Sequence, residues 1–125
     1  MNILNVPPRI AGQTASVTNL WDADTPPVLA SEFTATDWTE IDISPGAAPG
    51  LSSGILISAR PVGESLPSVK LAVRSSIDEI LVDSFVSRHN PFPLRFGEGD
   101  THIEAMVVEG DRPINILASG HQYFR

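Results

Sequence analysis

The pattern of apolar and polar residues changes character near residue 28. From there on, short β-compatible runs alternate with Pro- and Gly-containing turns at intervals of about ten residues. A period of two places successive side chains on opposite faces of a strand. Strands are predicted over residues 28–36, 38–44, 55–62, 68–75, 79–87, 91–96, 101–108 and 114–120. This spacing is typical of an all-β antiparallel β-sandwich, of which the jelly roll is one form.

Two of these runs differ in how many of their faces are apolar. Residues 68–75 place Val69, Leu71 and Val73 on one face and polar or small residues on the other, as expected for a strand with one face in the core. Residues 79–87 are apolar on both faces, which predicts a central strand.

Eleven prolines and nine glycines leave little room for long helices. The prolines within 91–96 predict an edge strand, because proline cannot donate a ladder hydrogen bond. A single helical turn is predicted near 75–81, where Ser76 is spaced to cap it with Glu79 three residues later.

The tripeptide Glu-Gly-Asp occurs twice, at 98–100 and 109–111, on either side of the run 101–108. Gly99 and Gly110 are expected to provide positive φ angles where hairpin turns require them. The repeat is therefore interpreted as two turns that bound one strand.

Residues 1–27 contain two Pro-Pro pairs and few periodic apolar positions, so they are predicted to form an extended N-terminal arm ahead of a single β-sandwich domain at 28–125. A disordered tail is the alternative. An ordered arm would lie on this subunit or on a neighbour. The predicted partner-binding residues are Ile3, Leu4, Val6, Arg9, Ile10 and Trp21 in the arm, with Tyr123 and Phe124 at the other end.

Composition limits the classes of partner. With 125 residues the chain suits one domain, and only 6% of its residues are aromatic, so Val, Ile, Leu and Ala must fill the core. The net charge of −7 argues against nucleic-acid binding. No run approaches the roughly 20 apolar residues of a membrane helix. Seven of the eight cations are Arg, which indicates either interface pairing or a GC-rich genome.

The residues offer little for catalysis or metal binding. There is no Cys, and no Gly-x-Ser-x-Gly motif occurs. The chain has three histidines and no His-x-His pair; only Glu104 follows His102 at that interval. A mixed site of His102, Glu104 and His121 is conceivable, but an outward-facing strand position is the favoured interpretation for His102 and Glu104. The sequence therefore predicts a non-enzymatic protein without metal or cofactor.

Two tryptophans remain. Trp38 is predicted to pack in the core or between the sheets, as Trp usually does in a small β domain. Trp21 lies in the Pro-rich arm and is the better candidate for an anchor that inserts into a pocket of a partner.

The succession "WTEIDISP", "GILISARPVG", "SVKLAVRSS" and "RPINILASG" within 37–120 resembles small virion proteins of tailed bacteriophages. The chain departs from that pattern at Asn115, where a cation is expected. The matching residues are Trp38, Ile41, Asp42, Ser44, Gly54, Ile55, Pro113, Ile114, Ala118, Ser119 and Gly120.

The resemblance implies a β-sandwich in the virion, as a capsid decoration (cement) protein that stabilises the head shell. It implies a homo-oligomer, with a trimer favoured, that contacts the major capsid protein or another virion protein. A tail component or a receptor- or carbohydrate-binding module is the alternative, followed by a cupin-like metal-binding protein.

Overall fold

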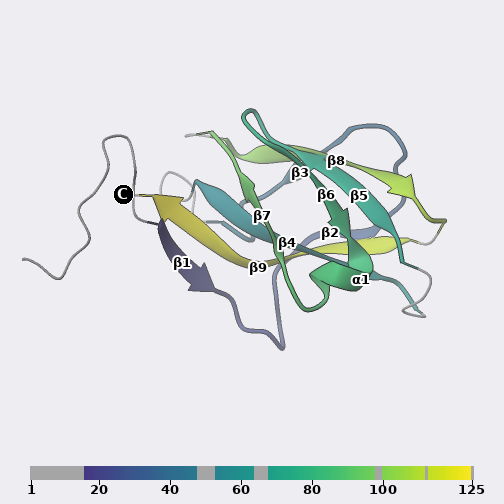
Figure 1. The fold of residues 1–125 in the computed structure, drawn as a ribbon, viewed down its shortest axis with the longest axis horizontal. Helices are drawn as coiled ribbons and strands as arrows, with labels where there is room; N and C mark the ends of the chain where they lie inside the picture. The colour runs from purple at the N-terminus through teal and green to yellow at the C-terminus, as the bar shows by residue number, and fades with distance from the viewer. Residues whose placement is uncertain (1–15, 48–52, 64–67, 98–99, 112, 125) are drawn as a thin grey trace, which may run out of the picture.

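Two antiparallel sheets packed face to face form the protein (Figure 1), so the predicted all-β sandwich is confirmed. The computed structural model describes residues 16–47, 53–63, 68–97, 100–111 and 113–124. In chain order the elements are β1 (Ser16–Leu20), β2 (Val28–Phe33), β3 (Thr39–Asp42), β4 (Gly54–Pro61), β5 (Lys70–Arg74), β6 (Glu79–Asp83), α1 (Ser84–Ser87), β7 (Phe92–Arg95), β8 (His102–Glu109) and β9 (Ile114–Phe124).

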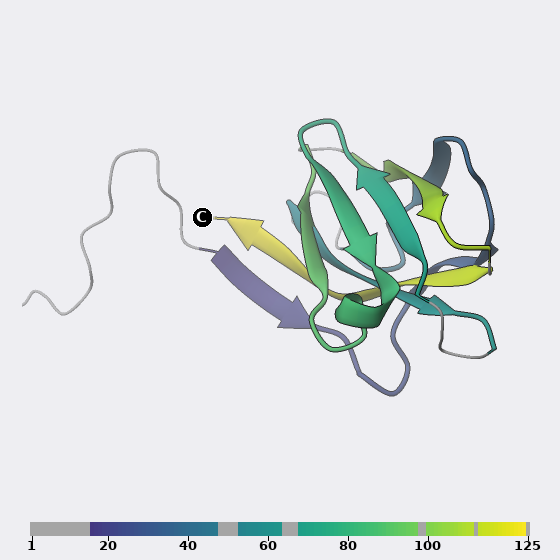
Figure 2. The same cartoon turned by 45° about the vertical axis from the view of Figure 1, so that its right-hand side comes forward.

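The pairing of the strands is nested. β5 pairs with β6, β4 with β7, β3 with β8 and β2 with β9, all antiparallel. The chain is thus one long hairpin rolled into two layers, which is the arrangement of a jelly roll. Sheet A has the order β1-β9-β4-β7, with β2 also on β9, and sheet B has the order β3-β8-β5-β6. Figure 2 shows the two layers from a second side.

Strand β9 organises sheet A. It pairs with β4 along one edge, and along the other it pairs with β2 and then with β1. The β1–β9 pair, which we call the ribbon, extends beyond β4 at the end where Ser16 faces Phe124 (Figures 1 and 2), whereas its Leu20–Gly120 end lies beside Leu56 of β4. Strand β1 was not predicted from the sequence and falls within the predicted arm. Residues 1–15 lie outside the described part of the chain, so the arm and its boundary at residue 27 stay predictions.

The space between the sheets is filled mostly by aliphatic side chains, as the low aromatic content requires, and Phe33 and Phe96 are buried with them. Inward positions alternate along β8, where Ile103 and Ala105 are buried while His102 is exposed. The largest fully buried side chains are those of Ile43, Ile55, Ile57, Val69, Leu71, Val73, Val82, Leu94, Ile103, Ile114 and Ile116.

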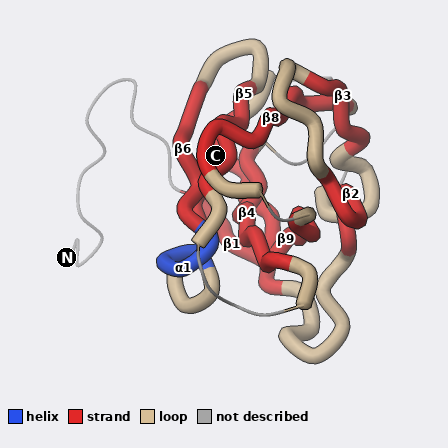
Figure 3. The backbone as a smooth tube through the Cα atoms, turned by 90° about the vertical axis from the view of Figure 1, so that its right-hand side faces the viewer, coloured by secondary structure: helices blue, strands red, loops and turns tan. Residues whose placement is uncertain are grey.

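Two predictions about residues 75–87 are wrong. Ser75–Asp78 form a hydrogen-bonded turn, in which the Ser75 amide donates to the Asp78 carbonyl at 2.8 Å, instead of a helical turn. The strand predicted over 79–87 ends at Asp83, and β6 lies at the edge of sheet B instead of its centre. The chain then forms α1, the single helical turn in Figure 3.

Helix α1 presents its polar side chains inward and its apolar ones outward. Ser84 and Ser87 are buried, whereas Phe85 and Val86 are exposed. The Ser84 hydroxyl accepts a hydrogen bond from the Val69 amide at 2.8 Å. The Ser87 hydroxyl accepts from the amide of Ala59, residue 59 of β4, at 3.1 Å.

These two backbone groups lie where strand pairing stops. β7 covers β4 only from Gly54 to Ile57, and β6 covers β5 only from Lys70 onward. The hydroxyls of α1 therefore replace the missing strand partners of one backbone amide in each sheet. The helical turn closes this edge of the sandwich.

Trp38 does not lie in the core, so that prediction is wrong. The side chain is half-buried, and the guanidinium carbon of Arg74 lies 4.0 Å from its ring centroid. Arg74 is also held by Glu104, whose Oε1 lies 2.8 Å from the Arg74 Nε. A cation above the ring face shields the indole from water on the outer side of sheet B.

The interpretation of the second Glu-Gly-Asp copy as a turn is confirmed. Gly110 has a φ of 105° at the end of β8. Gly99 lies outside the described residues. Strand β7 is at the edge of sheet A, as its prolines predicted.

Replacing either inward hydroxyl of α1 should destabilise the fold. Ser84→Ala and Ser87→Ala each leave a backbone amide without a partner, which costs about 1–3 kcal/mol of unfolding free energy. Urea denaturation measures the loss. Ser31→Ala on the exposed face of β2 is the matched control and should change stability by less than about 0.5 kcal/mol. A Ser87→Ala protein as stable as the control would contradict this role.

Candidate functional site

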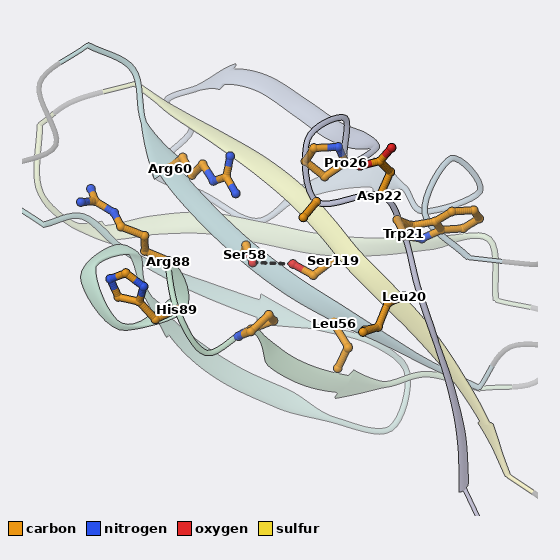
Figure 4. Close-up of a pocket in the computed structure, with 12 residues that line it drawn as sticks. Leu20, Trp21, Asp22, Pro26, Leu56, Ser58, Arg60, Arg88, His89 and Ser119 are labelled. Atoms are coloured by element: carbon orange, nitrogen blue, oxygen red, sulfur yellow. Dashed lines mark hydrogen bonds between the residues drawn. The ribbon is translucent and has the colours of Figure 1, made fainter.

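A hollow of about 350 Å³ lies on the outer face of sheet A (Figure 4). Its floor consists of Leu56 and Ser58 from β4 and Ser119 from β9. One wall is the loop that joins β1 to β2, and the other is the segment that follows α1. The volume falls in the lower part of the range of small-ligand pockets.

The β1–β2 loop is held against β9 at both of its ends. The Trp21 amide donates to the Ser119 carbonyl at 3.0 Å, and the Ala118 amide donates to the Pro27 carbonyl at 3.0 Å. Between these points the loop turns at Asp22, whose carbonyl accepts from the Thr25 amide at 3.2 Å. The wall is therefore fixed by backbone hydrogen bonds to the central strand of the sheet.

Trp21 is anchored within its own chain. Its indole Nε1 donates to the Gly46 carbonyl at 2.8 Å, and its ring centroid lies 5.2 Å from that of His121. The side chain nevertheless stays 37% exposed and lines the hollow, next to Leu20, which is 74% exposed. One face of the indole is thus held in place while part of the side chain remains accessible.

Two arginines and a histidine gather at the opposite end of the hollow. Figure 4 shows Arg60, Arg88 and His89 away from Leu20 and Trp21, with Asp22 beside Pro26. Arg60 projects from β4, and Arg88 and His89 are positioned by the end of α1. The hollow therefore has an apolar end and a cationic end.

The serines on the floor already have partners. The hydroxyls of Ser58 and Ser119 lie 2.8 Å apart, and Ser58 also lies 3.3 Å from the Ser87 carbonyl, to which it donates. This arrangement links the floor of the hollow to α1. Both hydroxyl hydrogens are therefore used within the protein, and the two oxygens can only accept hydrogen bonds from a ligand.

A second, polar hollow of about 220 Å³ lies on sheet B, lined by residues that include Glu40, Arg74, Ser76, Asp100 and His102. Within it, Arg74 pairs with Glu104, and Ser76 donates to Asp100 at 2.6 Å. This hydrogen bond is the main reason that the pKa of Asp100 is lowered from 3.8. Internal pairing makes this hollow a structural junction.

The residues predicted to bind a partner are only partly placed. Ile3, Leu4, Val6, Arg9 and Ile10 lie outside the described residues. Trp21 lines the hollow.

At the other end of the chain, Tyr123 pairs with Val17 and is half-buried, and the backbone of Phe124 pairs with Ser16. Both residues belong to the ribbon and lie at the opposite end of β1 from Trp21.

The conceivable metal site is not assembled. His102 and Glu104 lie on β8 in sheet B, whereas His121 lies on β9 in sheet A. Within the described ranges, no group of three or more His, Asp or Glu side chains is arranged to hold a metal ion. The inward positions of β8 are apolar instead.

Sequence reasoning missed Arg60, Arg88 and His89 as members of one site. The preference for Arg over Lys was the only signal that pointed to them, since Arg is the cation suited to interfaces. Their convergence depends on α1, which the sequence pattern presented as part of a strand.

Comparison with known proteins identifies no relative. No family model matches the chain, and neither the curated proteins nor the solved structures contain a match. In the part of the chain that the structure describes, no helix is both long enough and apolar enough to cross a bilayer.

Stability should depend on pH through His121. Burial lowers the pKa of His121 below 6.5, so the unfolded chain binds a proton before the folded chain does as the pH falls. The contribution of His121 to the unfolding free energy is fully present above about pH 6.5 and is lost as the pH falls through the lowered pKa. Denaturation curves between pH 7.5 and about pH 5 should show the loss in the wild type.

His121→Phe keeps an aromatic ring beside Trp21 and removes the proton site, so this loss should disappear. His89→Gln is the control and should retain it. Asp42 and Asp100 have lowered pKa values through their hydrogen bonds to Ser44 and Ser76, and their contributions are lost only below about pH 3.8. An unchanged pH profile in His121→Phe would rule out the assignment.

Proposed function

We propose that this protein is a structural component of a tailed-phage virion, a decoration protein that attaches to the head shell and stabilises it. The observation that carries the proposal is strand β1, an outer strand of sheet A that extends beyond β4 at Ser16 and is followed, at its other end, by exposed Leu20 and Trp21. The resemblance of residues 37–120 to small virion proteins supports the same role.

The ribbon offers two kinds of contact. Leu20 and Trp21 present apolar surface, and burial of a leucine side chain contributes about 1.5–3 kcal/mol to binding. In addition, β1 is the outer strand of its end of sheet A and presents unpaired backbone groups to solvent. A strand of a neighbouring protein can extend a sheet at such an edge.

Attachment of this kind stabilises a shell by mass action. A protein that binds the assembled shell and not its separated subunits adds its binding free energy to the assembled state. A homo-oligomer, with a trimer as the preferred form, presents several ribbons at once and gains affinity through multivalency.

Trp21 favours a second candidate, a receptor- or carbohydrate-binding module of a phage tail. Its indole is fixed by Gly46 and His121 and keeps part of its surface open to a ligand. An immobile aromatic ring is a platform for the apolar face of a sugar. Binding on a glycan array, together with no binding to heads, would select this function over decoration.

The primary test uses heads purified from phage in which the gene is deleted. The wild-type protein should co-sediment with them at micromolar concentration and raise their temperature of disruption. Light scattering of the pure protein should give the mass of an oligomer. Failure of the wild type to co-sediment with heads would reject the proposed function.

Leu20→Glu should weaken head binding at least about tenfold, because it replaces apolar contact surface with a charge. Leu81→Glu on sheet B is the matched control, since Leu81 is 53% exposed on the other sheet. Its affinity should match that of the wild type. Equal losses in the two variants would show that charge alone, and not the ribbon, determines binding.

A further inference from the structure

We propose that the hollow on sheet A binds an acidic peptide segment of the partner protein. An aspartate or glutamate side chain of the segment lies at the end formed by Arg60, Arg88 and His89, and a neighbouring apolar side chain lies against Leu20 and Leu56. The proposal rests on the proposed function for the identity of the partner and names the chemistry of its contact.

The arginines of the hollow differ from the other lysine and arginine residues that the structure describes. Lys70 pairs with Glu109 at 3.5 Å, Arg74 with Glu104 at 2.8 Å and Arg95 with Asp78 at 3.8 Å.

Among the described residues, Arg60 and Arg88 are the cations that have no carboxylate within 4.0 Å, and both line the same hollow. In a chain with a net charge of −7, carboxylates to neutralise them are abundant. Two unpaired guanidinium groups in one concave site therefore point to a carboxylate that another molecule supplies.

The rest of the lining favours a peptide over an acidic sugar. A sugar carries hydroxyl groups over most of its surface, and each needs a hydrogen-bond partner when it is buried. The hydroxyls of Ser58 and Ser119 on the floor have no hydrogen left to donate, so they can serve a ligand only as acceptors. The remaining lining is largely apolar, from Leu20, Pro26 and Leu56, which suits an aliphatic side chain.

Asp22 sets the orientation of the peptide. It lies beside Pro26, at the end away from Arg88 (Figure 4). Like charges repel, so the ligand carboxylate is excluded from that end. One Asp22 oxygen accepts from the Asp24 amide at 2.9 Å, and the carboxylate keeps capacity to accept a backbone N–H from the peptide.

The test is an NMR titration of the ¹⁵N-labelled protein with the peptide acetyl-Leu-Asp-Leu-amide. Its asparagine counterpart, acetyl-Leu-Asn-Leu-amide, is the matched ligand control, and glucuronate is the acidic-sugar control. We expect the aspartate peptide to shift the Trp21 indole signal and the Arg60 and Arg88 Nε–H signals. The asparagine peptide should bind at least about tenfold more weakly. Glucuronate should produce no comparable shifts.

Variants locate the contact. The double variant Arg60→Gln with Arg88→Gln should bind the two peptides equally. Each single variant should lower the preference for the aspartate peptide about fivefold. Arg95→Gln removes the same charge outside the hollow and should keep the preference. Asp22→Asn should bind the peptide as tightly as the wild type or more tightly. Amide spectra of each variant verify that it is folded.

The following results would overturn the proposal: equal shifts with the two peptides, shifts confined to residues outside the hollow, or binding of glucuronate without the peptide. Head binding distinguishes this proposal from the proposed function. If the wild type and the double arginine variant bind heads equally, the peptide site is wrong and decoration stands. If the wild type does not bind heads while the peptide results hold, decoration is wrong and the site stands.

Discussion

The fold depends on two serine hydroxyls that complete the backbone hydrogen bonding of both sheets. Where β7 and β6 end, the Ser87 hydroxyl accepts a hydrogen bond from the Ala59 amide and the Ser84 hydroxyl accepts one from the Val69 amide. A buried amide without a partner costs more than most single apolar contacts provide, so this edge must be closed. One helical turn meets the need in both sheets at once, and its apolar residues consequently face outward.

The same turn connects the interior to the hollow. Ser58 donates to the Ser87 carbonyl and bonds to Ser119. Arg88 and His89 directly follow α1 and line one wall of the hollow. The opposite wall is fixed by backbone hydrogen bonds to β9. Both walls of the hollow are thus fixed by hydrogen bonds to the sheets. The distance between the arginines and Trp21 therefore stays constant, which favours ligand binding.

The period-two pattern predicted most of the strands, because inward Val, Ile and Leu alternate with polar residues wherever one face of a strand is buried. It failed at Ser84–Ser87, because the local pattern gives no sign that these serines point inward. They are buried because they accept hydrogen bonds from amides of β4 and of the residue before β5 that have no strand partner. It also failed at β1, whose partner is β9 at the far end of the chain. The hollow combines residues of β1, β4, β9, the β1–β2 loop and the segment after α1, so no local spacing could have revealed it.

The nested pairing has a consequence for the order of assembly. As the chain is synthesised, β5 and β6 are the first of these pairs to be complete. Strands β7, β8 and β9 follow, and they pair with β4, β3 and β2 in that order. Strand β9, the central strand of sheet A, is made after all the others. Until it emerges, β1 and β2 have no strand to pair with, so the ribbon and the wall of the hollow are the last parts of the molecule to exist.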